Sequence, residues 1–254
     1  MEMNSVPILQ LINVTRTFDG LKALDSLSLS INRRTITAIV GPNGSGKTTL
    51  FNVITGLLRP GAGTIIFKGR NITYLAPDKI ARSGIGRTFQ AIRVFPQITV
   101  IENMLLALEK ERIQGLFYGL NPFIRHSSEK LTAKAVELLS MVELRNKINE
   151  FAGDLSHGQR RLLEIMRAVA LDADLYLFDE PTAGVFPEVR TRILNLFKLL
   201  KENGKTIIFV EHNMDAVLDG AQRVIVLDKG KIIADGEPGL VLENEKVVEA
   251  YFGG

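Results

Sequence analysis

The sequence predicts an α/β protein with a mixed, largely parallel sheet, an N-terminal antiparallel β portion and an inserted helical subdomain. Two predicted buried strands, 175–178 (LYLF) and 205–210 (KTIIFV, apolar from residue 207), flank an amphipathic helical pattern at 187–204. Continuous apolar strands separated by helices are typical of a parallel sheet covered on both faces. The segment 27–31 alternates apolar and polar residues instead, which is typical of a half-buried antiparallel strand.

Glycine and proline divide the rest of the α/β pattern into short elements. The helix at 48–58 is expected to stop at Arg59, because Pro60 and Gly61 follow it. In chain order we expect strands at 8–14, 27–31 and 35–40, the helix at 48–58, a strand at 63–69 and a final hairpin of strands at 223–228 and 231–236.

The middle of the chain has helical periodicity. Apolar residues recur on one face over 100–108 and again over 131–142. The segment between them, GLFYGLNPFIRHSS at 115–128, is rich in glycine, proline and aromatic residues, and we expect it to be irregular. These patterns place the helical subdomain at about 89–155. The predicted core then comprises about residues 1–88 and 156–254.

Composition excludes several classes of function. The chain has no cysteine, which excludes disulfides, a thiolate nucleophile and cysteine-ligated zinc. The net charge is only +3, and the basic residues are interspersed with nearly as many acids, so we expect no nucleic-acid partner. No signal peptide and no run of about 18 apolar residues is visible. We therefore expect a cytoplasmic protein that reaches a membrane only through a partner.

The segment GPNGSGKT at 41–48 matches the pattern G-x-x-x-x-G-K-[ST], between a predicted strand and a predicted helix. Its backbone N–H groups and the helix N-terminus can bind phosphate oxygens, while the lysine reaches the β- and γ-phosphates. The alternative is a glycine-rich turn with an incidental lysine, which the strand–loop–helix context disfavours. The predicted nucleotide-binding residues are Gly41, Pro42, Asn43, Gly44, Ser45, Gly46, Lys47, Thr48 and Thr49.

Two carboxylates follow the apolar strand at 175–178, where parallel sheets bind their ligands. Asp179 is predicted to bind Mg²⁺ together with the Thr48 hydroxyl, and Glu180 to accept a proton from the attacking water. On its own this pair also fits a strand that ends in a solvated acidic turn.

A third segment, LSHGQ at 155–159, precedes a predicted helix. Ser156 is a suitable N-cap, and the small Gly158 lets the backbone approach an anion. Taken alone, the segment is equally an ordinary capped helix. The residues it adds to the predicted nucleotide site are Ser156, His157, Gly158 and Gln159.

Together, the order and spacing of these three motifs closely resemble the ATP-binding cassette (ABC) family of ATPases, across residues 9–252. The resemblance implies a P-loop NTPase core, ATP and Mg²⁺. It also implies that Phe18 stacks on adenine, that Gln90 senses Mg²⁺ and water, and that His212 contacts the γ-phosphate. Catalytic roles thus fall on Glu180, His212, Lys47 and Gln90, and metal binding on Thr48, Gln90 and Asp179.

The resemblance further implies a head-to-tail dimer in which LSHGQ of one subunit covers the ATP of the other. GRTFQAIRVFPQITVIENM at 86–104 and the C-terminal segment are similar to the ATPase subunits of branched-chain amino-acid uptake systems. These systems imply transmembrane permease subunits and a second, different ATPase subunit, although a homodimer stays open. The helical subdomain, including the aromatic stretch at 116–123, is the candidate docking site for the permease, and the alternative that this stretch is a loop packed on its own subdomain stays open.

Two residues depart from the family pattern. His157 replaces the first glycine of the signature LSGGQ, and Phe186 stands where many members carry an aspartate that makes hydrogen bonds between subunits. Two alternatives to a transport ATPase also remain. One is an ABC ATPase that acts on nucleic acid or ribosomes, which usually has two cassettes or basic linkers. The other is a small-molecule kinase, which leaves LSHGQ, Gln90 and His212 without a role.

Overall fold

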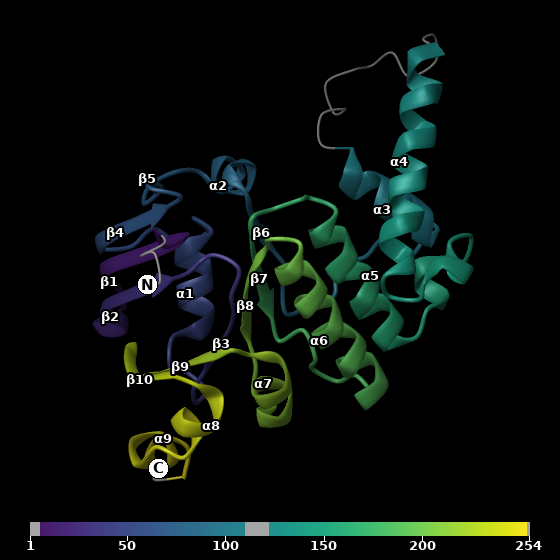
Figure 1. Ribbon diagram of the computed structural model, residues 1–254. Helices are drawn as coiled ribbons and strands as arrows, with labels where there is room; N and C mark the ends of the chain where they lie inside the picture. Colours follow the sequence, from purple (N-terminus) through teal and green to yellow (C-terminus); the bar gives the residue numbers. More distant parts are fainter. Residues whose placement is uncertain (1–5, 110–121, 253–254) are drawn as a thin grey trace, which may run out of the picture.

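Two sheets form the centre of the computed structural model, which describes residues 6–109 and 122–252 (Figure 1). One is a four-stranded antiparallel sheet of β1 (Leu9–Phe18), β2 (Leu21–Ile31), β4 (Ala62–Phe67) and β5 (Arg70–Asn71), in the order β2-β1-β4-β5. The other has six strands, in the order β10-β9-β3-β8-β7-β6. They are β3 (Ile36–Val40), β6 (Ile85–Arg87), β7 (Leu175–Asp179), β8 (Thr206–Val210), β9 (Arg223–Asp228) and β10 (Lys231–Gly236).

Neighbouring strands from β9 to β6 run parallel, and β10 pairs antiparallel with β9 at the edge. This arrangement confirms the predicted fold class, a mixed and largely parallel sheet with an N-terminal antiparallel portion. The helices are α1 (Lys47–Ile54), α2 (Pro77–Ser83), α3 (Val100–Leu108), α4 (Pro122–Ser140), α5 (His157–Val169), α6 (Pro187–Glu202), α7 (Met214–Gly220), α8 (Pro238–Leu242) and α9 (Glu245–Phe252).

Several element predictions are wrong in their bounds. Strands β1 and β2 are longer than the predicted 8–14 and 27–31. Helix α1 ends at Ile54 rather than at residue 58. Helix α4 begins at Pro122, so the segment 122–128 is helical rather than irregular. A proline is tolerated in the first helical turn, because the N–H groups there have no intrahelical acceptor. The rest of the predicted docking stretch, 116–121, lies outside the described residues.

The six-stranded sheet separates two apolar cores, because its strands point alternate side chains to opposite faces. Leu175 and Leu177 of β7 face a core formed with α1 and the antiparallel sheet. Tyr176 and Phe178 face the other core, formed with α3 to α7. The two faces together bury the strand completely, as its continuous apolar sequence predicts.

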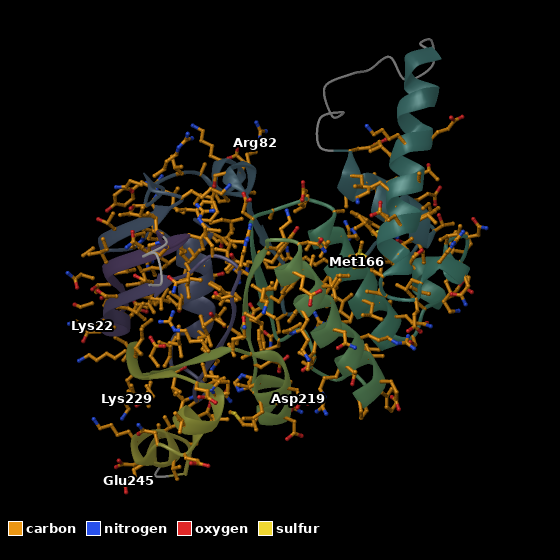
Figure 2. The ribbon with its side chains drawn as sticks, viewed as in Figure 1. Lys22, Arg82, Met166, Asp219, Lys229 and Glu245 are labelled. Carbon is orange, nitrogen blue, oxygen red and sulfur yellow. The ribbon has the colours of Figure 1, made fainter. Side chains whose placement is uncertain are left out.

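Helices α3, α4 and α5 pack against one another, and α5 also packs on the sheet. Met166 of α5 is fully buried, and Figure 2 shows it between helices, whereas Lys22 and Glu245 point outward from the molecule. Because α5 begins after residue 155, the helical layer extends beyond the expected subdomain, and that boundary stays a prediction. None of the helices in the described part of the chain combines the length and apolar character that a bilayer crossing requires.

Candidate active site

The predicted phosphate loop connects the buried strand β3 to α1. Gly46 stands at the N-cap with φ 109°, a backbone conformation that residues other than glycine rarely adopt. A Cβ atom at this position would lie 2.4 Å from the carbonyl oxygen of Ala23 in β2. Glycine is therefore required here both by the backbone conformation and by the close approach of another strand.

Lys47 is buried at the start of α1. Its Nζ donates hydrogen bonds to the carbonyl oxygens of Gly41, at 2.7 Å, and Pro42, at 2.9 Å, so the loop curls around its own lysine. Burial lowers the pKa of Lys47, and the nearby carboxylates of Glu180 and Asp179 oppose that shift. The ammonium group thus lies inside the loop and beside the end of β7. Elsewhere in the loop Ser45 is buried, Pro42 and Thr49 are half-buried, and Asn43, Gly44 and Thr48 are exposed.

The carboxylates at the end of β7 differ in environment. Asp179 is buried, and burial raises its pKa, an effect that the Arg87 guanidinium opposes. Glu180 has a left-handed backbone with φ 47°, which is uncommon for a residue with a side chain. Its N–H donates to the carbonyl oxygen of Val210 at 3.0 Å. Unusual backbone conformations of this kind occur preferentially at functional sites, where surrounding structure holds them.

Glu180 lies between two of the other predicted catalytic side chains. The Gln90 Nε2 donates to Glu180 Oε2 at 3.3 Å. On the other side, His212 Nε2 lies 3.3 Å from Glu180 Oε1. The fold therefore brings together, from three loops, an amide, a carboxylate and an imidazole that lie far apart in the sequence.

Arg87 was not predicted from the sequence. Its guanidinium donates to Asp179 Oδ2 at 3.2 Å, to Asn52 Oδ1 at 2.8 Å and to Thr55 Oγ1 at 3.1 Å. Both side chains of the Arg87–Asp179 pair are buried. Arg87 thus ties the Asp179 carboxylate to α1, the helix that follows the phosphate loop. The only sequence signal for Arg87 was its position in β6, directly before the segment TFQ. A single basic residue in a strand has no distinctive pattern, so this position did not predict a buried ion pair.

Replacing Arg87 by methionine is expected to lower the free energy of unfolding by about 3 kcal/mol, because it leaves a buried carboxylate without its partner. Urea unfolding monitored by circular dichroism measures this change. The exposed Arg59→Met serves as the control and should stay within about 0.5 kcal/mol of the parent. The double variant with Asp179→Asn should recover part of the loss. Equal urea midpoints for Arg87→Met and the parent would show that the pair does not matter.

Glu211 is a second buried charge that sequence reasoning missed. Its Oε1 accepts hydrogen bonds from the Thr182 N–H, at 2.8 Å, and the Thr182 hydroxyl, at 2.7 Å, while Oε2 accepts from the His212 N–H at 3.3 Å. Burial raises the pKa of Glu211, and these hydrogen bonds oppose the shift. The side chain therefore connects the loop after Glu180 to the loop that carries His212.

The LSHGQ segment forms the N-terminus of α5. Ser156 and Gln159 form a capping box, in which the Ser156 hydroxyl accepts from the Gln159 N–H and the Gln159 side chain accepts from the Ser156 N–H. Ser156 and His157 are exposed, Gln159 is half-buried, and Gly158 packs against Val189 of α6. Helices α1 and α5 belong to cores on opposite faces of the sheet (Figure 1). The chain thus presents two separate helix N-termini of the kind that bind anions.

Two of the exposed aromatic side chains stand at positions singled out by the family resemblance. Phe18, at the end of β1, is 40% exposed, and the Arg16 guanidinium lies 4.7 Å from its ring centroid. Its role as an adenine platform stays a prediction. Phe186, at the N-cap of α6, is 78% exposed and so offers an apolar contact where the family often has a carboxylate.

The residues predicted to bind Mg²⁺ fit that ion in their chemistry. A carboxylate at Asp179, a hydroxyl at Thr48 and an amide oxygen at Gln90 are the hard oxygen ligands that Mg²⁺ prefers. Within the described ranges, no group of three or more His, Cys, Asp or Glu side chains is placed to hold a metal ion without further ligands.

Residues 24–183 match the family described as ABC transporter. The chain is 40% identical over 248 residues to the probable branched-chain amino acid transport ATP-binding protein LivG of Archaeoglobus fulgidus, covering 97% of this chain and 95% of that protein. It is 36% identical over 252 residues to the high-affinity branched-chain amino acid transport ATP-binding protein LivG of Salmonella typhimurium, covering 98% and 99%.

Solved structures are similar over nearly the whole fold. The ADP conformation of an ATP-binding cassette of an ABC transporter has a TM-score of 0.85 and 36% identity, covering 98% of this chain and 100% of that one. A dimeric cassette in a post-hydrolysis state, bound to ADP and phosphate, has a TM-score of 0.76 and 30% identity, covering 91% and 98%.

Proposed function

Because this chain belongs to the ABC transporter family of ATPases, we propose that it is the ATP-hydrolysing subunit of a membrane importer for branched-chain amino acids or similar small solutes. The observation that carries the ATPase assignment is the placement of Glu180 between Gln90 and His212, next to the lysine of a phosphate loop. The solute is inferred from the names of full-length relatives, since no residue of this subunit is expected to contact it.

In this proposal each residue of the site has a separate task. The N–H groups of residues 41–48 and the Lys47 ammonium hold the phosphates. Glu180 accepts a proton from the attacking water, and Gln90 and His212 orient that water and the γ-phosphate. Thr48, Asp179 and Gln90 would hold Mg²⁺, which would neutralise charge at the phosphates. The products are ADP and inorganic phosphate.

A second subunit is needed to complete this site. Charge spreads over the transferred phosphoryl group during hydrolysis, and one phosphate loop offers limited positive dipole at its outer side. The exposed N-terminus of α5, with Ser156 and His157, would supply N–H donors to the ATP bound by the partner subunit. ATP then holds the two subunits together, and hydrolysis releases them. This cycle of closing and opening can drive transport. The partner is a second ABC ATPase, either a different chain or a copy of this one.

Transmembrane permease subunits would provide the membrane attachment at the inner face of the cell membrane. Apolar side chains stand exposed on the helical layer and beside the Gln90 segment, among them Phe95, Leu106 and Phe151. Exposed apolar side chains of this kind can be covered by an apolar protein contact. We therefore propose that the permease contacts this layer, near Gln90.

Isolation of the complex from native membranes tests this function. A tagged Glu180→Gln chain, kept in ATP, is purified with its partners, which are identified by mass spectrometry. The proposal predicts two hydrophobic membrane proteins and a second ATPase subunit. Recovery of ribosomes or nucleic acid would instead assign the ATPase to a different task, and the untagged chain controls for adhering proteins.

A further inference from the structure

Residues 89–93 connect β6 to the helical layer without regular secondary structure. Gln90, within this segment, is the residue whose amide reaches Glu180. The position of a side chain on an irregular segment depends on the contacts that fix the main chain at that residue. The contacts of the main-chain groups of 89–93 therefore decide how well Gln90 is placed.

Two charged side chains of α5 hold this main chain. Arg161 donates from Nη2 to the carbonyl oxygen of Gln90, at 3.0 Å, and from Nη1 to that of Phe89, at 3.3 Å. Glu164 Oε1 accepts from the N–H of Arg93 at 3.1 Å. The same two side chains pair with each other, Arg161 Nη1 to Glu164 Oε2, at 2.8 Å.

The Arg161–Glu164 pair is almost fully buried, with 3% of Arg161 and 5% of Glu164 exposed. A buried ion pair adds little stability over apolar residues of similar size, because desolvation offsets the attraction. Here the Arg161 guanidinium and the second oxygen of the Glu164 carboxylate also form hydrogen bonds to the main chain of 89–93. Apolar side chains could not form these hydrogen bonds. Arg167, two turns from Arg161 on the same helix, adds a hydrogen bond to the carbonyl oxygen of Arg93.

We propose that Arg161 and Glu164 are positioning residues for ATP hydrolysis, which fix residues 89–93 to α5 and so set the reach of the Gln90 amide to Glu180. This inference rests on the proposed function. Helix α5 begins at the LSHGQ segment assigned to the partner's nucleotide, so a displacement of α5 would be passed to the segment that carries Gln90 through these hydrogen bonds. The pair thereby joins the nucleotide of one site to the catalytic carboxylate of the other.

A spin label tests this placement independently of activity. The chain has no cysteine, so Ala91→Cys, at an exposed position, gives a single site for a nitroxide. Arg161→Met and Glu164→Gln are each expected to increase the mobility of the label in the electron paramagnetic resonance spectrum. Without the label, they should lower kcat by about tenfold or more, since small misplacements are costly, while the Kd for ATP changes by less than about twofold.

Leu139→Ala is the matched control, because it removes a buried apolar side chain from the same helical layer without removing a hydrogen bond. It should lower the Tm but leave label mobility and kcat near the parent values. Arg161→Lys, which keeps the charge but reaches fewer acceptors, should be intermediate. The proposal is overturned if Arg161→Met and Glu164→Gln match Leu139→Ala in mobility and kcat. A parent complex, isolated from membranes with its partner subunits, that does not hydrolyse ATP would refute the proposed function, and the label would still decide the placement of 89–93.

Discussion

Replacing Glu180 by glutamine is expected to lower the rate of ATP hydrolysis by about 10²- to 10³-fold while ATP still binds. The amide keeps the size of the side chain but cannot accept a proton from water, and a positioned general base contributes a factor of this order. Gln90 and His212 lie within 3.3 Å of the carboxylate and would still flank the amide. Phosphate release measures the rate, and retention of labelled ATP measures binding.

Glu188→Gln is the control for this substitution, because Glu188 is an exposed glutamate in the first turn of α6. It should hydrolyse ATP at the rate of the parent. A Glu180→Gln variant that keeps more than about half of the parent rate would show that another group accepts the proton, and would remove Glu180 from the mechanism.

Lys47→Ala is expected to weaken ATP binding by about 100-fold or more. Charge-assisted hydrogen bonds from the buried ammonium to phosphate are worth roughly 1.5–3 kcal/mol each, and a tenfold change in Kd corresponds to about 1.4 kcal/mol. Truncation also frees the Gly41 and Pro42 carbonyl oxygens that Lys47 now binds, so the loop should become less ordered. Equilibrium binding of a fluorescent ATP analogue measures the loss.

The exposed Lys198 of α6 provides a substitution with the same charge change, Lys198→Ala, which should bind ATP as tightly as the parent. If Lys47→Ala retains the parent affinity, the nucleotide does not occupy the loop at 41–48, and the assigned site is wrong.

The sequence predicted those parts of the molecule whose signals are local. The phosphate loop, the apolar strand β7 and the helix N-cap at Ser156 each follow from a short pattern, because backbone conformation and capping depend on neighbouring residues. Gln90 and His212 came only from family resemblance. The structure brings both to Glu180, although their roles there stay predictions.

The buried charges could not be predicted in this way. Arg87 and Asp179 are 92 residues apart, and Arg161 and Gln90 are 71 apart, so neither pairing leaves a periodic signal in the sequence. Charged residues are also expected at the surface, which hides buried ones among the many that are solvated. The start of α4 was missed for a different reason, because proline was read as a helix breaker although it stands in the first turn.

In the proposed function two subunits enclose each ATP, and the mass of the Glu180→Gln chain in solution tests this enclosure most directly. Light scattering is measured without nucleotide, with Mg-ADP and with saturating Mg-ATP. We expect twice the mass of the single chain with Mg-ATP, and a return to the single-chain mass without nucleotide or with Mg-ADP. A chain that binds Mg-ATP but remains a monomer would contradict a site shared between two copies of this chain, and the partner would then have to be a different ATPase subunit.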